Sequence, residues 1–305
     1  MQYRLSVLLF IVMAACGGQG GNTTPTTPTP APVDSTPAPT VMPRPLGTAQ
    51  VSDATCLATP GYSIPSGAKC RSAVVVCPEI SSASARIRSV DPRAGVAYTG
   101  TIVLSTGGDG TNFYILDTPS IVRDMANTFS NDGLMTVEVA WDAPGIWQGP
   151  KGPQSWACRY ATVSRWIYDN LHRGGSQTLF AGVGTSGGAA QIAFALSYYG
   201  VDSFFGLAVL GGGPPGCPLC TTPEQVTERL FTGTPQLNFP RTPVRSLLGD
   251  QDPNSGGTAD SAKAYSDAIT SVKSWEILPN TPHIVENSQA GHDAIIRWVR
   301  DALRR

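Results

Sequence analysis

A serine flanked by glycines lies past the middle of the 305-residue chain, in the stretch GTSGGA at positions 184–189. An apolar run at 179–183 precedes it, and a run of good helix formers at 189–196 follows it. A Gly-x-Ser-x-Gly turn between a strand and a helix exposes the serine hydroxyl on a strained backbone, and its neighbours must be small. This setting favours Ser186 as a nucleophile over a serine in an ordinary glycine-rich loop.

A serine hydroxyl becomes reactive at neutral pH when a base lies within hydrogen-bond reach and an acid orients that base. The chain has three histidines. His283 follows the last predicted strand and precedes the final predicted helix, which suits a base. His292, at or near the start of that helix, stays open as an alternative, with capping or surface exposure as its other role. His172 ends the helix before the nucleophile strand, at the opposite end of the predicted sheet from Ser186, so we expect it to be solvated or helix-terminal.

The acid is expected before the histidine and after another strand. The stretch VRSLLGDQDPN at 244–254 places two carboxylates there, Asp250 and Asp252. From residue types alone, either can orient the base, and either can shape the turn.

Hydrophobic patterning predicts the elements that must position these residues. Apolar or alternating runs predict strands at 74–77, 85–89, 96–105, 134–141, 178–183, 204–210, 244–248 and 275–278. Helical spacing predicts helices at 120–129, 156–171, 188–199, 259–271 and 294–303. Alternating strands and helices predict an α/β protein with a mostly parallel sheet covered on both faces, whose functional residues lie at the carboxyl ends of the strands.

The nucleophile turn, the acid and the histidine, in this order, resemble the serine hydrolases of the α/β-hydrolase fold. The resemblance runs from about residue 70 to the C-terminus, and it is specific for the superfamily but not for a substrate. It implies a mostly parallel central sheet with helices on both faces. In that family the acid often stands three residues after a glycine that ends its strand, which points to Asp252 after Gly249.

Acyl transfer also needs hydrogen-bond donors for the developing oxyanion. One is expected to be the backbone N–H of Gly187, directly after the nucleophile. The stretch STGGDGTNFY at 105–114 resembles the family's oxyanion loop, with Thr106 where a histidine often stands. The resemblance implies the backbone N–H of Gly108 as the second donor, with Gly107 or Asp109 as alternatives, and a plain glycine turn is the other interpretation.

These residues predict an exported serine hydrolase that cleaves a carboxylic ester through an acyl-enzyme on Ser186, without a cofactor or a metal. A peptidase or acyltransferase of the same fold, or a non-catalytic ligand-binding lipoprotein, are the alternatives. The substrate would be a small-molecule or polymer ester. The formal net charge of −1 and the lack of a basic run argue against nucleic acid as a partner.

Aromatic residues near the predicted site can line a substrate cleft or fill the core, and the sequence does not separate the two: Phe113, Tyr114, Trp141, Trp147 and Trp156. A short helical candidate at 222–230 can form a small cap, but it is too short for a large lid domain.

The N-terminal region predicts export. Residues 1–15 have an early positive charge and an apolar stretch too short to span a bilayer, as a signal peptide does. The ending MAAC resembles the lipobox of bacterial lipoproteins, which implies cleavage before Cys16 and its lipidation, with plain secretion as the alternative. Gly17 follows Cys16 in place of the aspartate that often retains such proteins at the inner membrane, which favours outer-membrane anchoring in the cell envelope. Residues 16–45, rich in proline and threonine, predict a disordered tether before a single hydrolase domain at 46–305.

Six further cysteines lie in the predicted domain: Cys56, Cys70, Cys77, Cys158, Cys217 and Cys220. An even number in an exported domain predicts structural disulfides, and 15 pairings are possible. The CPLC stretch at 217–220 also fits a redox or zinc motif, but neither the βαβ setting nor the second pair of ligands that such motifs need is present.

Overall fold

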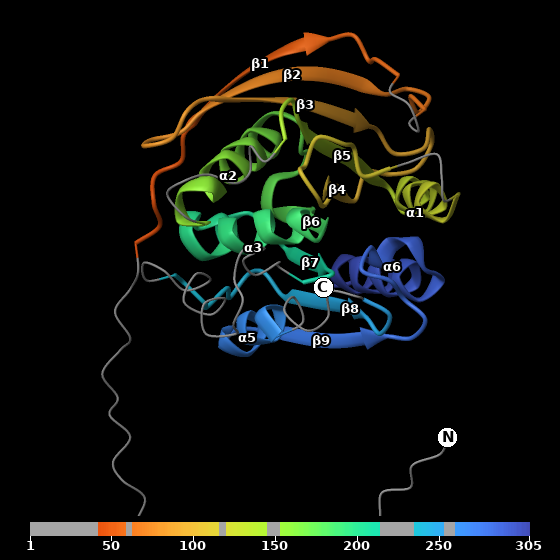
Figure 1. Ribbon diagram of the computed structural model, residues 1–305. Helices are drawn as coiled ribbons and strands as arrows, with labels where there is room; N and C mark the ends of the chain where they lie inside the picture. Colours follow the sequence, from red (N-terminus) through yellow and green to blue (C-terminus); the bar gives the residue numbers. More distant parts are fainter. Residues whose placement is uncertain (1–41, 59–62, 116–119, 145–152, 214–234, 253–259) are drawn as a thin grey trace, which may run out of the picture. The chain divides into compact units, whose positions relative to one another are not determined.

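The computed structural model describes residues 42–58, 63–115, 120–144, 153–213, 235–252 and 260–305. Their strands form one sheet in the order β1-β2-β3-β5-β4-β6-β7-β8-β9 (Figure 1). The strands are β1 (Thr48–Ala54), β2 (Lys69–Val76), β3 (Ala83–Val90), β4 (Gly100–Ser105), β5 (Leu134–Trp141), β6 (Leu179–Thr185), β7 (Leu207–Gly211), β8 (Val244–Gly249) and β9 (Lys273–Leu278).

Two kinds of strand pairing divide the sheet. Strands β1, β2, β3 and β5 pair antiparallel, whereas β5, β4, β6, β7, β8 and β9 pair parallel in that spatial order. Every residue of β4, β5, β7 and β8 is buried. Parallel strands covered on both faces are mostly apolar, which is why the sequence showed these strands clearly.

Helices cover both faces of the sheet, as the sequence predicts. They are α1 (Ser120–Asn131), α2 (Pro153–Asn170), α3 (Gly187–Tyr199), α5 (Asp260–Ala268) and α6 (Gln289–Leu303). Residues of α2, α3 and α5 belong to one hydrophobic core, and residues of α1 and α6 belong to a second core on the other side. In Figure 1, α2 and α3 lie over one side of the central strands and α1 and α6 over the other.

The helix α1 shows how local sequence decides packing. Val122, Met125 and Phe129 recur at helical spacing and are the buried residues of this helix. They enter the core on the α6 side of the sheet, while the opposite face of α1 is polar. A helix with one apolar stripe is stabilised mainly by burying that stripe against a sheet.

The structure differs from the sequence predictions mainly at element ends. Strand β4 begins at Gly100 rather than at 96, because residues 93–96 form a turn in which the N–H of Val96 donates to the Arg93 carbonyl at 3.0 Å. Helix α6 begins at Gln289 rather than at 294, because Ser288 caps it by accepting a hydrogen bond from the Gly291 N–H. Strand β1 was not predicted at all.

Two disulfides join described residues, which confirms the prediction of structural disulfides for these four cysteines. Cys56–Cys70 links the segment after β1 to β2, and Cys77–Cys158 links the end of β2 to α2. Cys217 and Cys220 lie outside the described residues.

Residues 1–41, which contain the predicted signal peptide, Cys16 and most of the predicted tether, also lie outside the described residues. No helix in the described ranges is both long and apolar enough to cross a bilayer.

Candidate active site

Ser186 lies at the carboxyl end of β6, directly before α3. Its backbone has φ 54° and ψ −115°, which is a strained conformation for a residue with a side chain. The turn is so tight that a Cβ built on Gly188 would lie 2.0 Å from the Ser105 carbonyl oxygen. A glycine is therefore required two residues after the serine, and this requirement is the physical content of the Gly-x-Ser-x-Gly pattern.

His283 and Asp252 meet at the same edge of the sheet. Asp252 follows the end of β8 and His283 follows the end of β9, and His283 Nδ1 lies 2.7 Å from an oxygen of the Asp252 carboxylate. The Asp252 side chain is fully buried, and the His283 side chain is 19% exposed. A carboxylate can only accept here, so Nδ1 carries a proton in this contact and the neutral ring keeps an acceptor at Nε2.

The other aspartate and the other histidines lie elsewhere. The exposed Asp250 carboxylate accepts from the Thr281 N–H at 3.1 Å, so it holds the turn before His283. His292 lies in the first turns of α6, with Nδ1 2.8 Å from Asp293. His172 follows α2 and lies beside the start of β6, at the opposite edge of the sheet from Ser186.

Ser186 and His283 both approach the turn that ends β7. The Ser186 N–H donates to the Gly211 carbonyl at 2.8 Å. A Cβ built on the next residue, Gly212, would lie 3.1 Å from Cε1 and 3.3 Å from Nδ1 of His283. Among the described residues, no hydrogen bond joins the Ser186 hydroxyl to His283. Such bonds are often long or unformed in free enzymes and form when substrate binds.

The loop after β4 packs directly over the turn that carries Ser186. A Cβ built on Gly107 would lie 2.8 Å from Cβ and 3.4 Å from Oγ of Ser186. Gly108 follows with φ 62°, and the Gly110 N–H closes the loop on the Gly107 carbonyl at 3.2 Å. The predicted oxyanion loop therefore lies against Ser186.

Gly187, the other predicted donor, is the first residue of α3. The N–H groups of the first helical turn have no acceptor within the helix, and the helix dipole makes that end favourable for negative charge. The alternative residue Asp109 uses its carboxylate to hold the Thr111 N–H at 2.9 Å.

A buried acid that the sequence analysis missed lies beneath these residues. Glu286 is 5% exposed and belongs to a short 3-10 helix, η4 (Val285–Asn287), that begins two residues after His283. Its carboxyl accepts from the Thr185 hydroxyl at 2.5 Å, and Thr185 directly precedes Ser186. Burial raises the pKa of Glu286, which the Thr185 hydrogen bond and the neighbouring His283 partly offset. Its only sequence signal was an acid three residues after the candidate base.

A second buried acid holds the segment that follows the predicted oxyanion loop. Glu138 of β5 and Arg88 of β3 form an ion pair at 2.6 Å, with both side chains almost fully buried. Glu138 also accepts from the Ile115 N–H at 2.7 Å, and Arg88 donates to the Ile115 carbonyl at 3.2 Å. Burial raises the pKa of Glu138, while Arg88 and the Ile115 N–H act in the opposite direction. The pair thus fixes residues just beyond the loop that packs on Ser186.

The aromatic residues near the site fall mostly in the core. Tyr114, Trp141, Trp156 and Phe113 are all at least nine-tenths buried. The Trp141 indole N–H donates to the Gln191 side chain at 2.9 Å, and the Arg88 guanidinium lies 4.4 Å from the centre of the Phe113 ring. Trp147 and the predicted cap at 222–230 lie outside the described residues.

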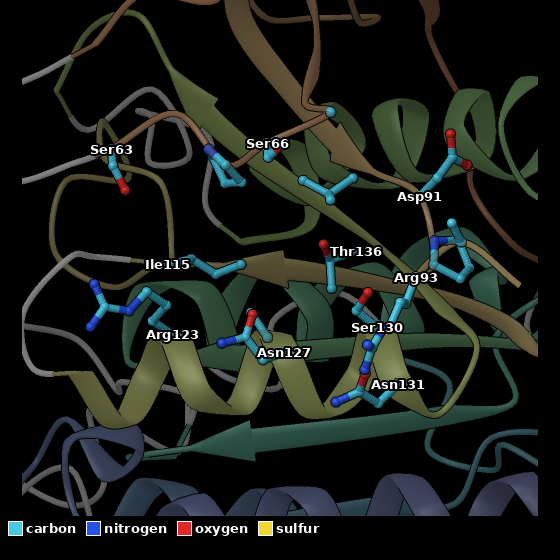
Figure 2. Close-up of a pocket in the computed structure, with 16 residues that line it drawn as sticks. Ser63, Ser66, Asp91, Arg93, Ile115, Arg123, Asn127, Ser130, Asn131 and Thr136 are labelled. Atoms are coloured by element: carbon cyan, nitrogen blue, oxygen red, sulfur yellow. The ribbon is translucent and has the colours of Figure 1, made fainter. Parts of the chain in front are cut away.

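A cavity of about 940 Å³ lies along the polar face of α1. Figure 2 shows Arg123, Asn127 and Asn131 along that helix, with Ser63 and Ser66 on the opposite wall. No predicted catalytic residue lines this cavity. Residues 145–152, 214–234 and 253–259, which come after β5, β7 and β8 in the sequence, lie outside the described residues.

Within the described ranges, no group of three or more histidine, cysteine, aspartate or glutamate residues is arranged to hold a metal ion. The chemical groups gathered around Ser186 are a hydroxyl, an imidazole oriented by a buried carboxylate, and backbone N–H groups. This arrangement suits proton transfer to and from an attacking oxygen and stabilisation of an oxyanion.

Comparison with solved structures finds esterases. An acetyl xylan esterase from Paenibacillus sp. R4 matches with a TM-score of 0.52 at 14% identity, over 85% of this chain and 89% of that one. Est1E from Butyrivibrio proteoclasticus matches with a TM-score of 0.51 at 11% identity, over 76% of this chain and 98% of that one. Its structure with ferulic acid bound gives a TM-score of 0.52 at 10% identity, over 76% of this chain and 99% of that one.

No protein-family model and no curated protein sequence matches the chain. Matches at such low identity establish the fold alone. That fold agrees with the strand order and the helical layers described above. The chain has the α/β-hydrolase fold.

Proposed function

We propose that the protein is a serine hydrolase that cleaves carboxylic esters through an acyl-enzyme on Ser186. One observation carries this proposal. The buried Asp252 carboxylate contacts His283 at the edge of the sheet where Ser186 occupies a strained turn. Strain of this kind is uncommon for a residue with a side chain, and it clusters at functional sites.

In the proposed reaction, the Ser186 oxygen attacks the ester carbonyl carbon while His283 Nε2 accepts the hydroxyl proton. Asp252 keeps the imidazole in the required tautomer and stabilises its positive charge. The Gly187 and Gly108 N–H groups hold the oxyanion. The C–O bond to the alcohol then breaks, and the alcohol leaves with the proton from His283.

The second half of the reaction releases the acid. A water molecule gives a proton to His283 Nε2 and attacks the acyl carbon of the Ser186 ester. The tetrahedral intermediate collapses, the serine oxygen regains the proton, and the carboxylic acid leaves. Throughout, the proton moves between His283 and oxygen atoms, while Asp252 stays ionised.

An ester is the proposed substrate class because the structural neighbours named above are esterases, one of which was crystallised with ferulic acid. Because one fold hosts many reactions, the substrate class is tested directly with matched esters and amides.

A fluorophosphonate probe and a substrate panel test the proposal together. We expect the probe to label Ser186 in the wild type and not in Ser186→Ala. We expect esters in a series of increasing acyl length to be cleaved faster than the matched amides. Faster cleavage of the amides would favour a peptidase, and acyl transfer to an added alcohol in excess of hydrolysis would favour an acyltransferase. Folded protein that resists the probe and cleaves no ester would favour a ligand-binding protein.

We also propose that the protein is exported and anchored to the bacterial envelope, most simply the outer membrane, by lipid on Cys16. The disulfides Cys56–Cys70 and Cys77–Cys158 support an oxidising compartment. We expect the wild type in the membrane fraction and Cys16→Ser in the soluble fraction or unprocessed. A wild-type protein found soluble would contradict the anchor.

A further inference from the structure

We propose that Glu286 is a positioning residue for Ser186 and His283, because its carboxyl joins the end of the nucleophile strand to the segment that carries the base. This inference rests on the proposed serine hydrolase function. Glu286 acts through Thr185, so it is distinct from the residues that touch the substrate.

The contact bridges two parts of the chain that are remote in sequence. Thr185 is the last residue of β6, and its hydroxyl donates to the Glu286 carboxyl across 101 positions. Ser186 follows Thr185 directly, and His283 precedes Glu286 by three residues. The Thr185–Glu286 hydrogen bond therefore joins two segments of the chain. One lies directly before the proposed nucleophile, and the other lies just after the proposed base.

The carboxyl–hydroxyl contact is packed rather than solvated. A Cβ built on Gly211 would lie 2.5 Å from Cγ2 of Val285 and 3.0 Å from Oγ1 of Thr185. The end of β7 therefore touches both sides of the bridge, and the Gly211 carbonyl also accepts the Ser186 N–H. Loss of the bridge is therefore expected to shift the backbone next to Ser186, because close-packed interiors transmit strain.

Stability alone does not account for an acid at this position. Burying a carboxyl costs free energy unless it is well paired, and an apolar side chain of similar size is often equally or more stabilising. Burial raises the pKa of Glu286, and burial, followed by the nearby Glu286 charge, raises the pKa of Tyr114. Groups that cost stability and lie next to reactive residues are candidates for function.

Loss of the bridge is expected to slow chemistry more than binding. Misplacing a reacting group by about 1 Å can cost about 100-fold in rate. Glu286 is buried beneath Thr185, so its removal changes the position of Ser186 relative to His283 and leaves substrate contacts in place. We therefore expect a lower kcat with little change in KM.

The experiment measures kcat and KM for a chromogenic ester and the rate at which a fluorophosphonate labels Ser186. The variants are Glu286→Ala, Thr185→Val, their double mutant, Glu286→Gln and Thr185→Ser. Ser197→Ala is the control for loss of a buried hydroxyl, because Ser197 bonds the Tyr265 hydroxyl at 3.1 Å in another part of the core.

We expect Glu286→Ala and Thr185→Val each to lower kcat and the labelling rate by roughly 10- to 100-fold. The double mutant should be no slower than the slower single mutant, because both changes break one contact. Glu286→Gln and Thr185→Ser should retain most activity, since the amide oxygen still accepts and the serine hydroxyl still donates. Ser197→Ala should label at the wild-type rate.

The positioning role would be overturned if folded Glu286→Ala were labelled at the wild-type rate. It would also be overturned if the rate losses of the two single mutants multiplied in the double mutant. If Glu286→Ala does not fold, the comparison of Thr185→Val with Thr185→Ser tests the positioning role. Equal labelling rates for these two variants would overturn that role. Ser186→Ala separates the two proposals. If Ser186→Ala is inactive while Glu286→Ala and Thr185→Val keep the wild-type rate, only the positioning role fails. If Ser186→Ala stays active, the proposed function fails first.

Discussion

Two histidines at opposite edges of the parallel sheet differ in how their ring nitrogens are bound. At the amino edge, His172 Nδ1 lies 2.8 Å from the Tyr98 hydroxyl, and Nε2 donates to the Gly175 carbonyl at 2.9 Å. At the carboxyl edge, His283 Nδ1 bonds Asp252, and no described residue hydrogen-bonds its Nε2. A histidine with both nitrogens engaged is a structural link, whereas one oriented at Nδ1 and open at Nε2 can exchange protons with a substrate.

The two edges are separated by the length of a strand. Strand β6 has seven residues, so His172 beside its start and Ser186 beyond its end are about 20 Å apart. The difference between the histidines thus follows from the direction of the strands, since functional residues in such sheets gather at the carboxyl ends.

The largest effect should come from the proposed nucleophile and base. We expect Ser186→Ala and His283→Ala each to lower ester turnover by about 10⁴-fold or more, and the double mutant to be little worse, because the residues act as one unit. His172→Ala should keep most of its turnover per folded molecule. Steady-state kinetics on variants with wild-type circular dichroism spectra check this. An active His283→Ala beside an inactive His172→Ala would reverse the comparison.

The two aspartates near His283 should differ next. Asp252→Asn is expected to lower kcat by about 10³- to 10⁴-fold, because the amide can favour the wrong imidazole tautomer. Asp250→Asn should retain most activity, since its side-chain oxygen can still accept from the Thr281 N–H. Measuring kcat for both variants at the same pH provides the test, and similar losses in the two would argue against Asp252 as the orienting acid.

His172, at the amino edge, should affect the stability of the protein rather than its catalytic rate. Burial lowers the pKa of His172 below 6.5, so the unfolded chain binds more protons than the folded protein just below that pH. The stabilisation by the neutral ring is present above about pH 6.5 and is lost as pH falls through the folded pKa. We expect the melting temperature of the wild type to fall more steeply than that of His172→Gln between about pH 7 and 5. Parallel curves would contradict this assignment.

The smallest effect should come from the third histidine. His292 pairs with the exposed Asp293, and its own side chain is 13% exposed, so His292→Ala is expected to change kcat by less than about 2-fold and to lower stability by about 1 kcal/mol, mainly through lost packing. Kinetics and a urea titration measure the two quantities. An inactive, folded His292→Ala would move the base assignment away from His283.

Much of the fold was predictable because its strongest signals are local. The run LMTVEVAW gives strand β5 with the predicted bounds, Leu134–Trp141, since a strand buried on both faces is mostly apolar. Strand β1 was missed because it is a largely exposed edge strand, TAQVSDA, with little apolar patterning. Strand β7 begins at Leu207 rather than at 204 because a 3-10 turn at Val201–Ser203 places Phe204 before the strand.

The Ser186 turn was also predictable from the sequence, because the small residues that its tight geometry requires are close together in the chain. The sequence by itself also determined the order of the proposed nucleophile, acid and base, and the strand ends that they follow. The choice between Asp250 and Asp252 had no local signal beyond the resemblance, since two carboxylates two residues apart have the same chemistry. Their distances to His283 and Thr281 separate them in the structure.

Only the tertiary structure revealed the Thr185–Glu286 contact and the pairing of Arg88 with Glu138. Thr185 is an ordinary strand residue in sequence, and Glu286 is one acid in a polar stretch, so neither predicts its partner 101 positions away. Local patterns depend on sterics and burial within a few residues, and sequence therefore determines turns and strands. Contacts between remote side chains depend on how the strands are ordered in the sheet, and that order is decided by packing of the whole chain.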